Sequence, residues 1–264
     1  MGRFSIVHPL YMSFYSRPLY RDVAANWRGM VFVYLFLVLA LCWIPVAGVV
    51  KSMVSSYIAY EAPRIVSQIP EIRISGGMAT VDAKMPYAIK DTESGKPLAI
   101  LDTTGKTTSL DGSEAFVLLT ADSIILKRSD AETRIYKLTD ASDIVINQSE
   151  VNHWLDEFDY WFVFLMYPSM LFLSYMYRLL QALFFAFIGK MYNRSLGAGL
   201  DYQALLRISV IALTPCIILN TLFLVTKSVF PAWGLVCFFI SLAYLYFGIM
   251  ANVREKPAGD DAKR

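Results

Sequence analysis

The sequence predicts an α-helical membrane protein with about four transmembrane helices and an inserted extracytoplasmic, mostly antiparallel β domain. Of its 264 residues, 56% are hydrophobic and only 17% are charged, whereas a soluble domain usually carries about a quarter charged residues. The charges are concentrated in one central stretch and at the two ends. Long apolar runs flank that central stretch, which itself breaks into short alternating segments. This distribution is typical of a membrane protein interrupted by a soluble insert.

Four apolar segments supply the predicted transmembrane helices: residues 29–50, 159–190, 208–226 and 232–252. A bilayer core about 30 Å thick is crossed by roughly 20 helical residues. Residues 159–190 would form a longer helix than one straight crossing needs. We expect this helix to tilt, to emerge from the bilayer or to kink at Pro168. One long helix is favoured over two crossings because no loop signal divides it.

The distribution of basic residues predicts the orientation of these helices. Arginine and lysine residues occur in residues 1–28, around the loop 191–207 and in the tail 253–264, whereas the turn between the last two helices carries only Lys227. Basic residues favour the cytoplasmic side. We therefore expect both termini in the cytoplasm and residues 51–158 outside it, in a protein of the cytoplasmic (inner) membrane.

The segment 1–28 combines four arginines with many aromatic residues. Two interpretations remain open for it. It forms an amphipathic helix or helices on the inner membrane face, or it is a plain flank that only sets the orientation of the first transmembrane helix.

The segment 51–158 reads as a β-rich domain flanked by extensions of the membrane helices. The first helix is expected to continue outward until Pro63 bends the chain, and a helix near Ser149, capped by Ser149 or Asn147, leads into the second span. Gly76-Gly77 is a hairpin signal. Strands are predicted at residues 71–75, 78–82, 87–90, 98–101, 115–120, 123–127 and 134–138.

Composition argues against several classes of function. The net charge is only +2 and no basic block is present, so a nucleic-acid partner is not expected. Cys42, Cys216 and Cys237 all lie in apolar runs, where packing explains them better than disulfides or metal binding. His8 and His153, the two histidines, are predicted on opposite sides of the membrane. The sequence therefore predicts no catalytic residue, no cofactor and no metal site.

Arg178 is the sharpest exception to the apolar pattern. A charge inside a transmembrane segment is a functional-site hypothesis by default. Apart from Asp159 at the very start of the second span, the four predicted spans contain no Asp or Glu to pair with it, and Gln181 and Asn220 are the nearby polar candidates. The preferred interpretation is a side chain that extends to the membrane interface. The first alternative is a lipid or packing site formed by Arg178, Gln181 and Asn220. A role in transport is the least favoured alternative.

A second, weaker candidate is a surface site at His153, Asp156, Glu157 and Asp159. These residues could bind a cation or serve a membrane-surface enzyme of the cell envelope. The preferred interpretation is a solvated helix end at the membrane surface.

Two stretches resemble known families. The chain from His8 through Trp27, followed by Gln68 to Gly77, resembles a family of uncharacterised bacterial multi-pass membrane proteins, some of them linked to maltodextrin-utilisation loci. That resemblance implies a β-rich extracytoplasmic domain inserted after the first span. The stretch from Gly189 to Pro215 resembles the Yip1-type membrane fold, although Yip1-type domains commonly have five spans and no such insert. Because Yip1-type proteins act as membrane scaffolds, this second resemblance implies a non-enzymatic role.

The expected function is a non-enzymatic membrane scaffold or sensor-like accessory protein. Its partners would be the lipid bilayer and a membrane-protein or envelope partner bound by the extracytoplasmic domain. The alternatives are an accessory subunit in transport or lipid handling and, less favoured, a membrane-surface enzyme.

Overall fold

The computed structural model describes residues 3–129, 132–140, 143–228 and 230–253. The predicted tail 253–264 thus lies, beyond Val253, outside the described residues. The chain divides into two compact units. The helical unit comprises the chain up to Val50 and again from Val163, and the β unit comprises Lys51–Phe162.

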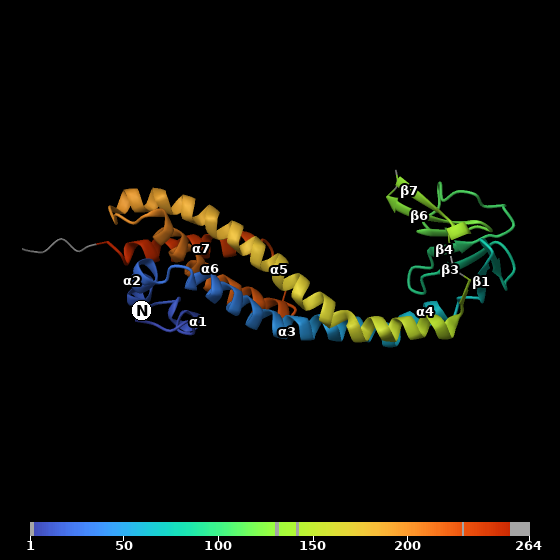
Figure 1. The fold of residues 1–264 in the computed structure, drawn as a ribbon, viewed down its shortest axis with the longest axis horizontal. Helices are drawn as coiled ribbons and strands as arrows, with labels where there is room; N and C mark the ends of the chain where they lie inside the picture. Colours follow the sequence, from blue (N-terminus) through green and yellow to red (C-terminus); the bar gives the residue numbers. More distant parts are fainter. Residues whose placement is uncertain (1–2, 130–131, 141–142, 229, 254–264) are drawn as a thin grey trace, which may run out of the picture. The chain divides into compact units, whose positions relative to one another are not determined.

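Among the residues that the structure describes, four helices are long enough and apolar enough to cross a membrane. They are α3 (Met30–Tyr60), α5 (Gln148–Leu196), α6 (Tyr202–Val225) and α7 (Trp233–Met250) (Figure 1). Helix α5 is 49 residues long and continues through Pro168 without a break. Helices α3 and α5 both pass from one unit into the other.

The N-terminal segment folds into two short helices, α1 (Pro9–Met12) and α2 (Arg17–Asn26). Ser16 caps α2 by accepting a hydrogen bond from the backbone N–H of Leu19 at 3.4 Å. One face of α2 packs against α6 and α7. Tyr20 and Val23 on that face have no exposed surface. This face therefore contacts protein, a role that the aromatic pattern of residues 1–28 did not reveal.

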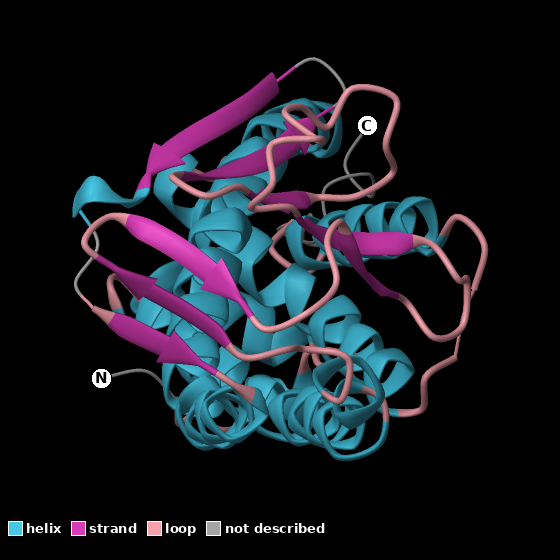
Figure 2. Ribbon diagram, turned by 90° about the vertical axis from the view of Figure 1, so that its right-hand side faces the viewer, coloured by secondary structure: helices cyan, strands magenta, loops and turns pink. Residues whose placement is uncertain are grey.

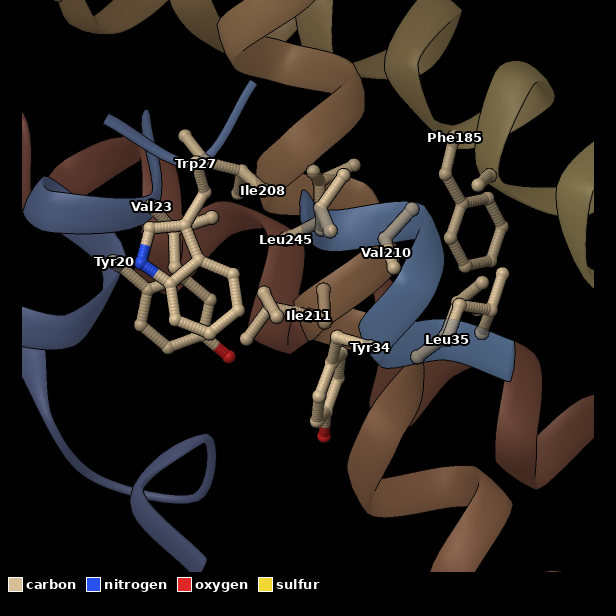
Figure 3. Close-up of a cluster of buried hydrophobic side chains, with 14 of the residues drawn as sticks. Tyr20, Val23, Trp27, Tyr34, Leu35, Phe185, Ile208, Val210, Ile211 and Leu245 are labelled. Atoms are coloured by element: carbon tan, nitrogen blue, oxygen red, sulfur yellow. The ribbon is translucent and has the colours of Figure 1, made fainter. Parts of the chain in front are cut away.

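The core of the helical unit forms where α2, α3, α5, α6 and α7 meet (Figure 3). Tyr20 and Trp27 lie on one side of it and Phe185 on the other. The hydroxyls of Tyr34 and Thr214, both buried, are 2.9 Å apart. This hydrogen bond satisfies two polar groups that would otherwise be costly inside an apolar core.

The β unit contains two sheets, which Figure 2 shows as separate groups of strands. The three-stranded sheet has the order β2-β1-β8 and the five-stranded sheet the order β3-β4-β5-β6-β7. The bounds are β1 (Ile72–Ser75), β2 (Met78–Val81), β3 (Tyr87–Lys90), β4 (Pro97–Leu101), β5 (Val117–Leu119), β6 (Ser123–Ser129), β7 (Glu132–Lys137) and β8 (Ile144–Ile146). The short helix α4 (Ala62–Val66) and the 3-10 helix η1 (Leu138–Asp140) complete the unit.

Each of the seven predicted strands has its counterpart within about two residues, but the sequence missed two features of the sheets. Strand β8 was not predicted, because three residues beside a helix start give almost no alternation signal. Strands β4 and β5 pair in parallel, so the five-stranded sheet is mixed. The parallel pair requires residues 102–116 to cross over between the two strands, and no local pattern reports such a crossover.

Two apolar clusters hold the β unit together. In the larger one, Ile72 and Ile74 of β1 are buried in the same cluster as Ile89, Leu101 and Leu119 of the five-stranded sheet. A smaller cluster contains residues of the crossover, β5 and β6: Leu110, Ala115, Leu118 and Ile125. Burying one such large apolar side chain contributes roughly 1.5–3 kcal/mol.

Candidate functional site

A groove of about 900 Å³ lies in the β unit beside the turn between β3 and β4. We call it the β groove. Its lining includes Ser94, Lys96, Glu114, Phe116, Lys127 and Arg128. The crossover, β6 and the β3–β4 turn supply these residues, which are far apart in the sequence.

The β groove presents an aromatic side chain among charges. Phe116 is 59% exposed although it directly precedes the buried strand β5. Lys96 and Glu114 form an ion pair at 3.0 Å, and Arg128 lies 3.6 Å from Glu132. An exposed aromatic ring rimmed by charged residues is a common composition of protein-binding surfaces.

The β3–β4 turn, residues 91–96, is held by Asp91. Its carboxylate accepts hydrogen bonds from the Ser94 hydroxyl at 2.5 Å and from the backbone N–H groups of Ser94 and Glu93 at 3.2 and 3.3 Å. The bond from the Ser94 side chain, followed by the backbone bonds, lowers the pKa of Asp91. Gly95 adopts φ +69°, a left-handed conformation that favours glycine. The turn therefore has a fixed shape.

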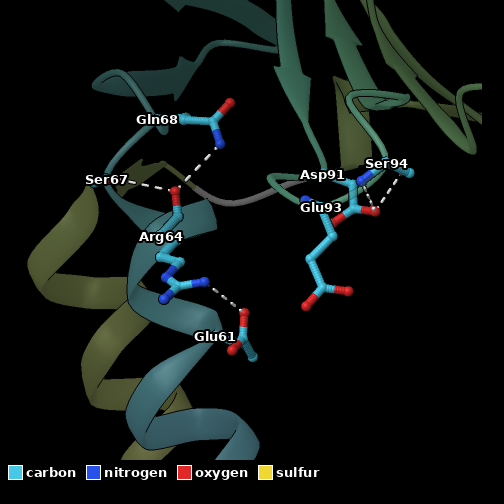
Figure 4. A network of polar contacts seen from close by, with 7 residues as sticks. All are labelled: Glu61, Arg64, Ser67, Gln68, Asp91, Glu93 and Ser94. Atoms are coloured by element: carbon cyan, nitrogen blue, oxygen red, sulfur yellow. Dashed lines mark hydrogen bonds and ion pairs between the residues drawn. The ribbon is translucent and has the colours of Figure 1, made fainter.

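The opposite side of the same turn faces the end of helix α3 and the start of α4 (Figure 4). A second hollow of about 220 Å³ is lined by Tyr57, Glu61 and Ile65 on the helical side and by Asp91 and Glu93 on the turn side. Asp91 thus lines both hollows. A single turn separates the β groove from the helix end.

Two glutamine side chains tie the helix ends to the rest of the β unit. Gln68 bonds to both backbone groups of Lys90: its Nε2 donates to the carbonyl at 2.9 Å, and its Oε1 accepts from the N–H at 2.9 Å. Gln148, at the start of α5, donates to the carbonyls of Ser67 and Ile69 at 3.0 and 3.2 Å. The Gln148 bonds join α5 to residues 67–69, the connection that follows α4. The Gln68 bonds join the same connection to the end of β3.

An ion pair joins α3 to α5 within the β unit. The Asp159 carboxylate lies 2.6 Å from Lys51 Nζ and accepts a hydrogen bond from Ser55 at 2.8 Å. The start of α5 is capped by Asn147, whose side chain accepts from the Glu150 N–H at 2.9 Å. Of the two capping residues that the sequence allowed, the structure selects Asn147.

The predicted surface site is split between separate contacts. His153 and Glu157, both exposed, lie 3.7 Å apart on one face of α5. Asp159 is engaged with α3, and Asp156 joins neither pair. Over the described part of the chain, no three His, Cys, Asp or Glu residues converge in a way that would hold a metal ion.

The structure brings Arg178, Gln181 and Asn220, the predicted lipid or packing site, close together. Arg178 Nη1 donates to Gln181 Oε1 at 2.6 Å, one turn along α5. Arg178 and Asn220 line the same small cavity of about 40 Å³ in the helical unit. The Asn220 side-chain oxygen accepts a hydrogen bond from Trp233 Nε1 at 3.1 Å. Arg178 therefore has neutral polar neighbours from α5 and α6.

The sequence did not point to the β groove. Its walls meet only because β4 pairs with β5 in parallel, which brings residues 113–116 beside the β3–β4 turn. The one local signal was Phe116, an aromatic residue at the start of a short strand, and burial in the core was the simpler interpretation of it.

The chain belongs to the family described as a protein of unknown function (DUF1189), whose pattern matches residues 7–249. The match spans both units, so helices and β unit together make up the family's domain. No curated protein and no solved structure shows significant similarity to the chain.

Proposed function

We propose that this protein is a multi-pass, non-enzymatic scaffold or sensor-like accessory protein of the cytoplasmic membrane, and that its β unit binds an envelope partner outside the cytoplasm. The four apolar helices support the membrane location. The basic residues at both ends of the chain support cytoplasmic termini.

One observation carries the functional part of the proposal. The β3–β4 turn forms a wall of the β groove on one side and faces α3 and α4 on the other. A partner seated in the groove would therefore contact the same rigid turn that borders the helix end. The bonds of Gln68, Gln148 and Asp159 then link this turn region to both α3 and α5.

The chemistry of the groove favours a protein partner. Phe116 offers apolar contact area, and Arg128 and Lys96 offer charge-assisted hydrogen bonds around it. Aromatic and arginine side chains commonly contribute most of the binding energy at protein interfaces.

The test uses the full-length protein with Phe116→Ala and Arg128→Glu combined. The matched control combines Met78→Ala with Lys84→Glu, since Met78 is 55% exposed and Lys84 is also exposed in the β unit, away from the groove. Partners crosslinked to the wild-type protein in intact cells are identified by mass spectrometry after purification. We expect the groove variant to lose at least tenfold of the recovered partner, as removal of a hot-spot residue commonly does.

The control variant should recover the partner at the wild-type level. Equal recovery by the groove variant and the wild-type protein, at equal expression, would show that the β groove is not the docking surface.

A further inference from the structure

Polar side chains from three helices line the 40 Å³ cavity of the helical unit. Cys42 comes from α3, Ser174 and Arg178 from α5, and Asn220 and Thr221 from α6. The remaining lining is largely apolar and includes Trp43. Polar residues are rare in the apolar segments of these helices, so it is unusual that several of them line one cavity.

The charge of Arg178 has no acidic counterpart in this cavity. The apolar segments of the four helices contain no Asp or Glu. Within the described ranges, no carboxylate forms an ion pair with Arg178, and its one hydrogen bond goes to the neutral oxygen of Gln181. A guanidinium has five N–H donors, so most of them stay available. A charge held among apolar helices is costly unless an opposite charge or several hydrogen bonds compensate it.

The cavity does not lie at either end of the apolar segment of α3. Cys42 follows Met30 by twelve residues and precedes Val50 by eight. At 1.5 Å per residue, Cys42 is about 18 Å along the helix from the first and about 12 Å from the second. On α6, the lining residues Asn220, Thr221 and Leu224 belong to the last two turns before Val225, so the cavity lies near that end of the helix. The turn that follows, residues 226–232, contains no Asp or Glu and therefore supplies no counter-charge.

Two groups around the cavity present hydrogen-bond donors to a ligand. The Asn220 oxygen is occupied by Trp233, which leaves the side-chain NH₂ group as the donor. The guanidinium of Arg178 adds its unused N–H groups, and the Ser174 hydroxyl can turn its hydrogen toward a ligand. The Thr221 hydroxyl donates to the Ile217 carbonyl at 3.0 Å, so it offers the cavity its oxygen and no hydrogen. The positive charge of Arg178 makes the cavity suited to an anion and repels a cation.

The size of the cavity restricts the anion. One water occupies about 10–15 Å³ of such space, so 40 Å³ holds only a few water-sized groups. A halide fits this space, whereas a lipid phosphodiester with four oxygens and two ester chains is larger than it.

We infer that this cavity binds a small inorganic anion of halide size, which neutralises Arg178 between α3, α5 and α6. The inference rests on the proposed membrane location of the four helices and is independent of any partner in the β groove.

The test measures thermal unfolding of the full-length protein in nanodiscs of neutral lipid. Chloride or bromide replaces gluconate at constant ionic strength, because gluconate is too large for the cavity. We expect the Tm of the wild-type protein to rise with halide concentration and to level off, since a ligand that binds only the folded state stabilises it. Arg178→Gln should abolish this rise. Lys190→Gln, which removes a cation from the same helix outside the cavity, should retain it.

Ser174→Ala provides a second variant in case Arg178→Gln does not fold. Removing one donor to a charged ligand should raise the halide concentration at half-saturation about tenfold. A Tm that does not respond to halide, or an equal response in the Arg178 variant, would overturn the inference. A Tm that responds to anionic lipid through Arg178 but not to halide would also overturn it and would assign the site to a lipid phosphate. A partner lost or retained at the β groove would change none of these outcomes.

Discussion

Asp102 is the residue on which the crossover loop of the β unit depends. The Asp102 side chain has no exposed surface. Asp102 accepts hydrogen bonds from the Thr104 hydroxyl at 2.6 Å and from the backbone N–H groups of Thr104 and Thr107 at 2.9 and 2.6 Å. The hydrogen bond from the Thr104 side chain lowers the pKa of Asp102 most, whereas burial raises it. The backbone hydrogen bonds lower it further, so that the pKa is about 2.

This pKa predicts how stability depends on pH. The folded pKa lies below the ordinary value of about 3.9, so the ionised form is favoured by folding. Its contribution is complete above about pH 4 and is lost as the pH falls through about 2. Asp102→Asn should lower the free energy of unfolding at pH 7 by about 1–2 kcal/mol.

Calorimetric unfolding of the full chain between pH 7 and pH 2 would measure the effect. The difference between Asp102→Asn and the wild-type protein should shrink below about pH 4. Asp82→Asn, an exposed substitution in the same unit, serves as control. A difference that stays constant to pH 2 would contradict the assignment.

At the scale of the element, the contact of α7 with α2 and α6 depends on one glycine. A Cβ atom at Gly248 would lie 2.6 Å from Tyr20 Cδ1 and 2.7 Å from Ile208 Cγ2. Both neighbours are fully buried, so neither has room to move. The absence of a side chain at Gly248 is therefore what allows the three helices to approach so closely.

Gly248→Ala should consequently destabilise the helical unit by about 1–3 kcal/mol, the usual cost of overpacking a core. Gly234→Ala, in the first turn of the same helix, is the matched control because no atom lies within 4 Å of its Cβ position. Thermal unfolding of the two variants in the same nanodiscs would compare them. Equal Tm values would show that α2 does not pack on α7 in this way.

At the scale of the whole molecule, the proposed topology places the β unit and the loop between α5 and α6 on opposite sides of one membrane. The two positions that report it best are Asp111, exposed in the crossover, and Ser195, exposed at the end of α5. Ser195 is preferable to Gly197, whose φ of +63° would strain another residue.

Cysteine labelling tests this topology after Cys42, Cys216 and Cys237 are replaced by alanine. An impermeant maleimide added to intact cells should label Asp111→Cys and leave Ser195→Cys unlabelled until the membrane is opened. Labelling of Ser195→Cys alone would invert the scheme, and labelling of both in intact cells would rule out the proposed number of crossings.

The sequence by itself determined the number and place of the long helices and most of the strands. Both depend on local information: the length of apolar runs and the period of alternation along the chain. It also singled out Arg178, because one charge stands out in an apolar segment.

Only the tertiary structure decided which residues meet. The parallel pairing of β4 with β5 creates the β groove. The packing of α2 against α6 and α7 buries Tyr20, whereas Tyr11 and Tyr15 of the same aromatic segment stay exposed. The neighbours of Arg178 on α3 and α6 likewise come from distant parts of the chain. Such contacts depend on how separate elements pack, and the local periodicity of a sequence carries no record of that packing.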